Sequence, residues 1–280
     1  MVGILGTGTM ARSISLLIAT SGHDVLVLGR SSKSLDAFNS YIAGWLHRRL
    51  EKGKISQEMH DVSISRINTT QELDSLSGAE LIIEAVVEDL EVKRDLLGAA
   101  DQVCPPKTMI ASNTSSLPIN EIASKTQHPN RVIGMHFMNP PHVMPLVEIV
   151  PSKSTSKETL DKAVAFAKSL GKEPFVVPDI PGFVLNRLLF VLLHEAMDLV
   201  EAGLVDVSTV DEALKNGANH PMGPFELADF IGLDVCLSIF EVLYRELQDA
   251  RYDPPRLLKE KVSAGKLGRK SGEGFYKYRR

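Results

Sequence analysis

Two ionisable side chains, His136 and Glu148, occupy positions in the chain that are typical of proton transfer chemistry. His136 follows the apolar run 132–135 and precedes a proline-rich turn, while Glu148 lies inside the apolar run 146–150. A carboxylate buried in a strand is costly unless it is paired. Two strands joined by a turn bring these side chains together, so that Glu148 orients the imidazole and raises its basicity. The alternative is an ordinary structural histidine.

Two other polar features mark places where a ligand is expected to bind. The first is the cluster at residues 112–116, which follows a predicted strand, and open α/β folds bind ligands at the carboxyl ends of their strands. Such a cluster can also be a capped helix start. The second is Asn186, in the first turn of a predicted helix. It either reaches across a cleft to donate to a carbonyl or is only a polar residue early in a helix.

A glycine-rich turn near the start of the chain predicts a dinucleotide site. Residues 6–11 read G-x-G-x-x-A, directly after a predicted strand and at the opening of a helix. The first glycine allows a tight turn, the second lets backbone amides approach a pyrophosphate, and a small third residue lets helix and strand pack closely. An ordinary tight turn is the alternative. The residues expected to bind the cofactor here are Gly6, Gly8, Thr9 and Met10.

The residues after the second predicted strand, 25–28, bear on which nicotinamide cofactor is used. NAD-binding folds usually place an acidic residue there to bond the ribose hydroxyls, but Gly29, Arg30, Ser31, Ser32 and Lys33 follow instead. Arginine can hold a 2′-phosphate that a carboxylate would repel. We therefore expect Arg30 and Ser31 to bind the cofactor, with NADP(H) favoured over NAD(H). The alternative is that Arg30 stacks on adenine and Lys33 is a solvated helix start.

These residues must be positioned by a sheet and its helices. Apolar runs alternate with helical patterns up to residue 180, which predicts a Rossmann-type, doubly wound α/β domain with a mainly parallel sheet. Prolines and a glycine at residues 178–182 indicate a linker. The expected domains are 1–180, which binds the dinucleotide, and an all-α domain at 181–280. The predicted helices of the second domain cover 183–201, 207–216, 224–248 and 256–263.

Composition excludes several classes of partner and location. The 280 residues carry a formal net charge of -4, which argues against a nucleic-acid partner, since these need a basic face. The longest apolar stretch, 183–200, is too interrupted by polar residues to cross a membrane. The first residues lack the features of a signal peptide. Cys104 and Cys236 stand in no metal or redox spacing, so we expect a cytoplasmic protein without a metal site.

Taken together, the sequence resembles the 3-hydroxyacyl-CoA dehydrogenase family, and within it the bacterial 3-hydroxybutyryl-CoA dehydrogenases. The resemblance covers essentially the whole chain. Seven ordered blocks are more specific than any single glycine motif, and they occupy residues 6–10, 84–88, 112–116, 134–140, 181–187, 217–224 and 268–276.

The resemblance implies roles for individual residues. His136 is the general base in oxidation and the acid in reduction, Glu148 is its partner, and Ser115 and Asn186 bond the reacting oxygen. The helical domain is expected to bind the acyl-CoA substrate and to form a homodimer. The remaining implied contacts are Glu88, Lys93 and Asn113 with the cofactor, and Ser115, Asn139, Asn186, Arg48 and Lys52 with the substrate. For the basic run at residues 48–54, which resembles the family's CoA phosphate region, an ordinary solvated helix end is the alternative.

One departure from the family pattern affects the expected direction of the reaction. Gly29 and Arg30 stand where the family usually has an acidic residue, which suggests NADPH-dependent reduction of acetoacetyl-CoA to the S product. Two rival hypotheses remain. A dehydrogenase of free 3-hydroxy acids has a similar layout but usually a catalytic lysine in its helical domain. A nucleotide-binding protein without activity would not need Ser115, His136, Glu148 and Asn186 together.

Overall fold

The chain folds into two compact units, Met1–Ile180 and Pro181–Arg280, and the computed structural model describes residues 1–278. Each unit has its own hydrophobic core. Within residues 1–278, each helix is either too short or too polar to span a lipid bilayer.

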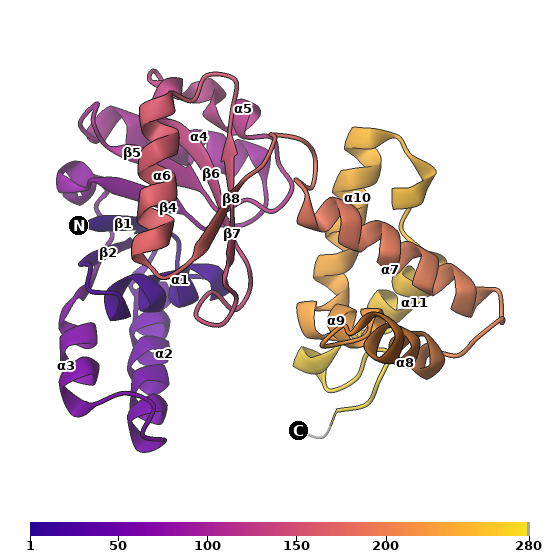
Figure 1. The fold of residues 1–280 in the computed structure, drawn as a ribbon. Coiled ribbons are helices and arrows are strands. Elements are labelled where there is room, and N and C mark those ends of the chain that lie inside the picture. The colour runs from indigo at the N-terminus through magenta and orange to yellow at the C-terminus, as the bar shows by residue number, and fades with distance from the viewer. Residues whose placement is uncertain (279–280) are drawn as a thin grey trace. The chain divides into compact units, whose positions relative to one another are not determined.

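The first unit is built on one sheet of eight strands in the order β3-β2-β1-β4-β5-β6-β7-β8 (Figure 1). Neighbouring strands are parallel except β6 and β7, which pair antiparallel. The predicted Rossmann-type α/β fold is therefore confirmed, as is the helical part that follows it. The strands are β1 (Val2–Leu5), β2 (Val25–Leu28), β3 (Ile67–Thr70), β4 (Leu81–Glu84), β5 (Met109–Ser112), β6 (Val132–Phe137), β7 (Leu146–Pro151) and β8 (Glu173–Val176).

Helices cover both faces of this sheet. Residues of α1, α2 and α6 pack with one face of the strands in a single core, and α4 and α5 pack against β4, β5 and β6 on the other. Four of the helices in this unit begin at a side-chain cap, of which Asp89 at α4 is an example. The helices are α1 (Thr9–Thr20), α2 (Ser32–Glu51), α3 (Gln57–Ser65), α4 (Leu90–Val103), α5 (Ile119–Ile122) and α6 (Lys157–Ser169), with short 3₁₀ turns at Leu73–Gly78, Ala123–Lys125 and Pro129–Arg131.

The second unit is helical, and buried aromatic rings fill its core. Phe190 and Phe240 meet edge-on with ring centroids 4.8 Å apart. Two buried aspartates, Asp211 and Asp229, accept backbone and tyrosine hydrogen bonds that hold the helices to the C-terminal segment. The helices are α7 (Leu185–Glu201), α8 (Val207–Ala218), α9 (Pro224–Ile231), α10 (Leu233–Leu247) and α11 (Arg256–Ser263), with 3₁₀ turns at Ala250–Tyr252 and Arg269–Ser271.

Three features differ from the sequence-based expectation. The single helix predicted over 224–248 is two helices, because Gly232 adopts a φ of 106° that ends α9 before α10 begins. Helix α3 and strand β3 were not predicted, since β3 is a short edge strand with the mostly polar sequence INTT. Strand β6 extends beyond the predicted run 132–135 to Phe137, because its last residues pair with β7.

Candidate active site

The structure brings His136 and Glu148 together. They are direct partners in the antiparallel register of β6 and β7, and Nδ1 of His136 lies 2.9 Å from Oε2 of Glu148. Both side chains are buried, with 7% and 2% of their surfaces exposed. A carboxylate only accepts hydrogen bonds, so Nδ1 carries the proton and donates it. The pairing therefore fixes the imidazole tautomer and leaves Nε2 as the nitrogen with a lone pair.

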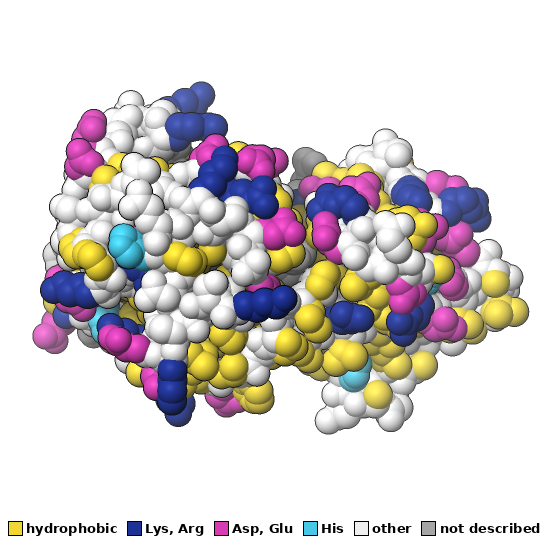
Figure 2. Space-filling model, turned by 90° about the horizontal axis from the view of Figure 1, so that it is seen from above, with side chains coloured by type: hydrophobic (Ala, Val, Ile, Leu, Met, Phe, Trp, Pro, Cys, Tyr) yellow, Lys and Arg dark blue, Asp and Glu magenta, His cyan; other side chains and the backbone are white. Residues whose placement is uncertain are grey.

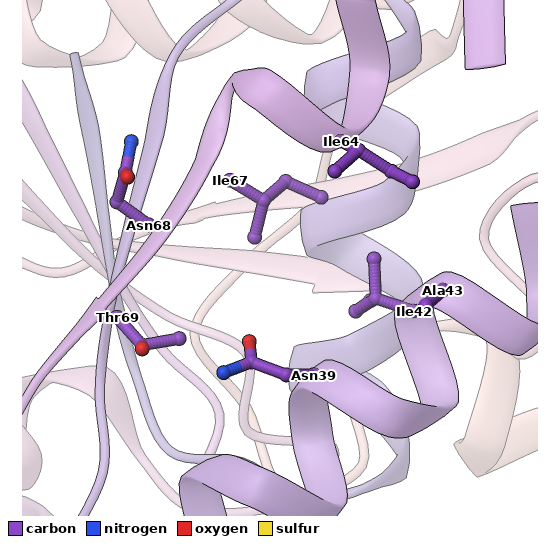
Figure 3. Close-up of a pocket in the computed structure, with 7 residues that line it drawn as sticks. All are labelled: Asn39, Ile42, Ala43, Ile64, Ile67, Asn68 and Thr69. Atoms are coloured by element: carbon purple, nitrogen blue, oxygen red, sulfur yellow. The ribbon is translucent and has the colours of Figure 1, made fainter. Parts of the chain in front are cut away.

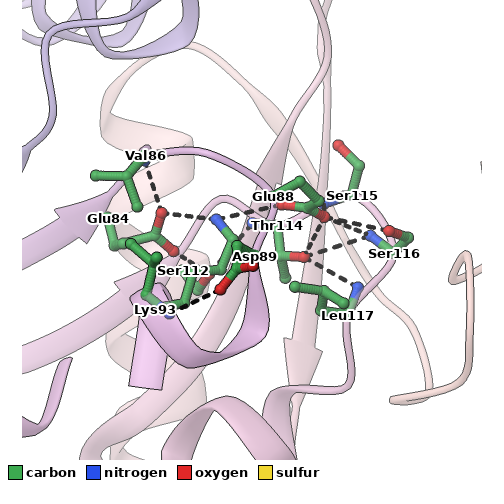
Figure 4. A network of polar contacts seen from close by, with 11 residues as sticks. Glu84, Val86, Glu88, Asp89, Lys93, Ser112, Thr114, Ser115, Ser116 and Leu117 are labelled. Atoms are coloured by element: carbon green, nitrogen blue, oxygen red, sulfur yellow. Dashed lines mark hydrogen bonds and ion pairs between the residues drawn. The ribbon is translucent and has the colours of Figure 1, made fainter. Parts of the chain in front are cut away.

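The turn that carries Ser115 is held by Glu88, which follows β4 (Figure 4). Oε1 of Glu88 accepts bonds from the backbone N–H groups of Ser115 and Ser116, at 2.8 and 3.1 Å, and from the Thr114 hydroxyl at 2.5 Å. Burial alone raises the pKa of Glu88, but the charge of Lys93 and these hydrogen bonds outweigh it and hold that pKa below its usual value. Glu88 is therefore an anion that fixes the backbone at Ser115.

Beneath this turn lies a second carboxylate, Glu84, which is fully buried at the end of β4. It accepts bonds from Nζ of Lys93 at 2.7 Å, from the backbone N–H of Val86 at 2.7 Å and from the Ser112 hydroxyl at 2.6 Å. Lys93 is 1% exposed and also lies 3.2 Å from Glu88. Sequence reasoning gave Glu84 no role. The available signal was a carboxylate ending an apolar strand, followed nine residues later by a lysine.

Asn113 links this region to the strand of the histidine. Its Oδ1 accepts a 2.9 Å hydrogen bond from the backbone N–H of Phe137, next to His136. The bond ties the end of β5 to the end of β6, so it also positions the imidazole. Asn139 lies two residues beyond Phe137 and is exposed in the turn between β6 and β7.

The glycine turn after β1 has the geometry that a pyrophosphate needs. Gly6 has a φ of 117°, and a Cβ there would lie 2.7 Å from the carbonyl oxygen of Ala85. A Cβ at Gly8 would meet nothing within 4 Å, so the backbone is open on that side. Helix α1, which begins with Thr9 and Met10, has neither a side-chain cap nor an acidic residue in its first turn. Its N–H groups and dipole therefore suit an anion.

Just after β2, the space that a side chain at position 29 would need is occupied by the side chain of Leu35. An ideal Cβ at Gly29 would lie 2.6 Å from Cγ of Leu35, a buried residue of α2. Arg30 is exposed. Ser31 caps α2, because its side chain accepts from the backbone N–H of Ser34. The loop thus presents a guanidinium and a capped helix start, and no carboxylate.

The basic residues at the end of α2 lie on different sides of the helix, so some are exposed and one packs against an aromatic ring. Arg48 and Lys52 are exposed. Arg49 belongs to the predicted basic run but was not singled out as a substrate contact. Its guanidinium lies 5.1 Å from the ring centre of Trp45, and Trp45 meets His142 edge-on at 5.2 Å. Among the described residues, the buried Nε of Arg49 finds no hydrogen-bond partner. Burial and the Arg49 charge lower the pKa of His142. The sequence contained a signal for this contact, because a tryptophan and an arginine four residues apart lie on the same side of a helix.

A separate pocket of about 400 Å³ opens between α2, α3 and β3 (Figure 3). It is lined by Asn39, Ile42, Ala43, Ile64, Ile67, Asn68 and Thr69, and these do not include the residues proposed for the active site.

Asn186 belongs to the second unit, in the first turn of α7. Its side chain is buried, with 8% of the residue exposed.

Comparison with known proteins decides the family. The model of the 3-hydroxyacyl-CoA dehydrogenase NAD binding domain matches residues 1–180, and that of the C-terminal domain of the same family matches residues 182–278. The chain belongs to the 3-hydroxyacyl-CoA dehydrogenase family. This confirms the resemblance on which the assignment of individual residues was based.

Relatives within the dehydrogenase family match over nearly their full length. The chain is 45% identical to a probable 3-hydroxybutyryl-CoA dehydrogenase of Bacillus subtilis, with 98% of this chain and 96% of the relative covered. It is 42% identical to a 3-hydroxybutyryl-CoA dehydrogenase of Clostridioides difficile, with 99% of each covered. The solved structure of (S)-3-hydroxybutyryl-CoA dehydrogenase PaaH1 from Ralstonia eutropha matches with a TM-score of 0.93 at 39% identity, covering 100% of this chain and 99% of that one.

Proposed function

We propose that this protein interconverts (S)-3-hydroxyacyl-CoA and 3-ketoacyl-CoA thioesters, with 3-hydroxybutyryl-CoA and acetoacetyl-CoA as its short-chain substrates. The observation that carries the proposal is the 2.9 Å bond between His136 and Glu148. It lies at the carboxyl edge of the parallel strands, the same edge as the glycine turn after β1. The names of the relatives from C. difficile and R. eutropha support the choice of substrate.

In this mechanism His136 moves the proton at the C3 oxygen. During oxidation Nε2 takes the hydroxyl proton and Glu148 stabilises the imidazolium that forms, and during reduction the imidazolium returns the proton. Ser115 and Asn186 bond the C3 oxygen and stabilise the charge that develops there. A bound nicotinamide cofactor supplies the hydride chemistry.

The cofactor that the residues after β2 suit is NADP(H), with NAD(H) as the alternative. Arg30 provides a charge for a 2′-phosphate, and Leu35 fills the space that an acidic side chain at position 29 would need. Gly6, Gly8, Thr9 and Met10 would hold the pyrophosphate, and Ser31, Glu88, Lys93 and Asn113 would line the rest of the cofactor.

The CoA part of the substrate binds along α2. Arg48 and Lys52 reach the phosphates from the exposed end of the helix, and Asn139 meets the substrate from the turn after β6. Arg49 adds a cation whose buried Nε still lacks a partner among the described residues, beside the indole of Trp45. This corner of the first unit combines an aromatic surface with positive charge, which suits a nucleotide carrying phosphates.

The second unit, residues 181–280, forms a homodimer interface in addition to binding substrate. Figure 2 shows hydrophobic side chains gathered on part of its surface. Leu188 and Leu204 are 68% and 70% exposed, and Val235 is 43% exposed. Apolar side chains that gather in one exposed patch are typical of a surface that a partner covers. Light scattering on the purified protein tests this, with a mass twice that of one chain as the expected result.

The proposed activity is tested by reduction of acetoacetyl-CoA, followed by NADPH and by NADH absorbance in parallel. We expect turnover with the thioester and no turnover with free acetoacetate, and a lower KM for NADPH. His136→Gln should abolish turnover while nucleotide binding survives. Turnover of the free acid at a comparable rate would support the rival hydroxy-acid dehydrogenase, and nucleotide binding without turnover of either substrate would support a protein without activity.

A further inference from the structure

The charges of Glu84, Lys93 and Glu88, at and just after the end of β4, do not cancel (Figure 4). The single ammonium of Lys93 lies 2.7 Å from Glu84 and 3.2 Å from Glu88, so one cation serves two carboxylates. Glu84 accepts three hydrogen bonds, the pattern of an ionised carboxylate. The low pKa of Glu88 keeps it ionised as well. The group therefore carries a net charge of −1, with Glu84 and Lys93 buried and the Glu88 side chain 31% exposed.

Neighbouring charges leave this excess negative charge in place. Asp89 caps the N-terminus of α4 by accepting from the backbone N–H of Val92, which offsets the positive end of the helix dipole. Arg94 pairs with Glu91 and Glu121 at the surface. Neither Arg94 nor the helix end supplies a second cation to Glu84, Lys93 and Glu88.

The three charged residues lie on the side of the sheet's switch point where the nicotinamide half of a dinucleotide is expected to bind. The strand order reverses between β1 and β4, and Leu5 at the end of β1 pairs in register with Glu84 at the end of β4. Open α/β sheets bind dinucleotides across this switch point, with the pyrophosphate at the first glycine turn and the adenosine ribose at the end of β2. The other half, which holds the nicotinamide, must then extend over the ends of β4 and β5, where Glu88 and Ser115 lie.

We propose that the net charge of Glu84, Lys93 and Glu88 makes the protein bind the oxidised nicotinamide, which is a cation, more tightly relative to the reduced, neutral ring. This inference rests on the cofactor site of the proposed function. In the reductive direction, a bound reduced cofactor would supply the hydride that goes to C3 of the keto thioester, and the His136 imidazolium would give a proton to the C3 oxygen. The products are the hydroxy thioester, the oxidised cofactor and neutral imidazole. Stabilising the oxidised ring therefore draws the equilibrium among bound species toward reduction of the substrate.

The effect is measured as a ratio of dissociation constants. One unit of charge at roughly 10 Å, in an effective dielectric constant of about 20 to 40, changes the ratio for the oxidised and reduced cofactor about four- to fifteenfold. Glu88→Gln keeps the size of the side chain and an oxygen for the Ser115 turn, but brings the group to neutrality. Glu84→Gln also brings the net charge of the three residues to zero, by removing the charge of the fully buried carboxylate.

The test titrates NADP⁺, NADPH, NAD⁺ and NADH into wild-type protein and variants, with nucleotide or tryptophan fluorescence as the signal. For each pair that binds, both Gln variants should raise the ratio of the oxidised to the reduced dissociation constant at least threefold. The matched control is Glu91→Gln, which removes one charge from the same helix at a side chain that is 63% exposed. The control should leave the ratio unchanged.

The outcomes separate the inference from the proposed function. A rise in both dissociation constants by the same factor would show that the group only positions the site, and would overturn the inference. Wild-type protein that binds none of the four nucleotides would overturn the proposed function along with it. If Glu84→Gln does not fold, as judged by thermal unfolding, Glu88→Gln decides the matter, because that side chain is 31% exposed and leaves the Glu84–Lys93 pair intact.

Discussion

Replacing Glu148 by glutamine removes a single charge from the buried pair and changes little else. Glu148→Gln keeps the size of the side chain and an oxygen that accepts from Nδ1 of His136, so the residue still fits between β6 and β7. What the variant loses is the charge that stabilises the imidazolium. A hydrogen bond to a charged group contributes about 1.5–3 kcal/mol. If that amount is lost only when the histidine is protonated, kcat falls about 10- to 150-fold.

The assay is steady-state oxidation of (S)-3-hydroxybutyryl-CoA, the direction in which the imidazolium forms, with kcat and KM determined separately for Glu148→Gln, His136→Gln and the double variant. KM for the thioester should change little, because Glu148 is 2% exposed and does not reach a ligand directly. The double variant should be no slower than His136→Gln alone, since residues that act as one unit are not additive. A kcat for Glu148→Gln within twofold of wild type would refute the reasoning, and so would a double variant much slower than His136→Gln.

Three further predictions concern the cofactor, the substrate and stability. Arg30→Glu should raise KM for NADPH at least tenfold while leaving that for NADH within threefold, and equal changes in the two steady-state constants would contradict the role of Arg30. Arg49→Ala should raise KM for acetoacetyl-CoA about tenfold with kcat retained, whereas Glu51→Ala, which removes an exposed side chain from the same helix turn, serves as the unaffected control. The pKa of Glu88 is lowered in the folded protein, so its stabilising contribution is present above the ordinary glutamate pKa of about 4.3 and is lost as the pH falls through the lower folded value. The difference in Tm between wild type and Glu88→Gln should therefore shrink on acidification below about pH 4.3.

The sequence was most informative where burying a polar group has a large cost. Glu148 stands inside an apolar strand, and that cost requires a partner, which the adjacent strand supplies in His136. The glycine turn after β1 could also be predicted from the sequence, because the positive φ at Gly6 strongly favours glycine.

Other features depend on packing that local patterns do not encode. Arg48 and Arg49 are neighbours in the sequence, and only the phase of α2 against Trp45 separates the exposed side chain from the packed one. The link from Lys93 to Glu84 depends on how α4 lies on β4. Likewise, nothing local distinguishes a helix that passes through Gly232 from two helices that meet there.

The contact between Gly29 and Leu35 constrains how nucleotide choice can change. A carboxylate cannot be installed at position 29 without displacing Cγ of Leu35, which would lie 2.6 Å from the new Cβ. Leu35 is in turn buried on α2, beneath the loop that follows β2. We therefore expect the two positions to be epistatic, because Gly29→Asp requires Leu35 to shift and a smaller residue at position 35 removes that requirement. A library that varies positions 29 and 35 together should yield acidic residues at 29 more often than one that varies position 29 alone.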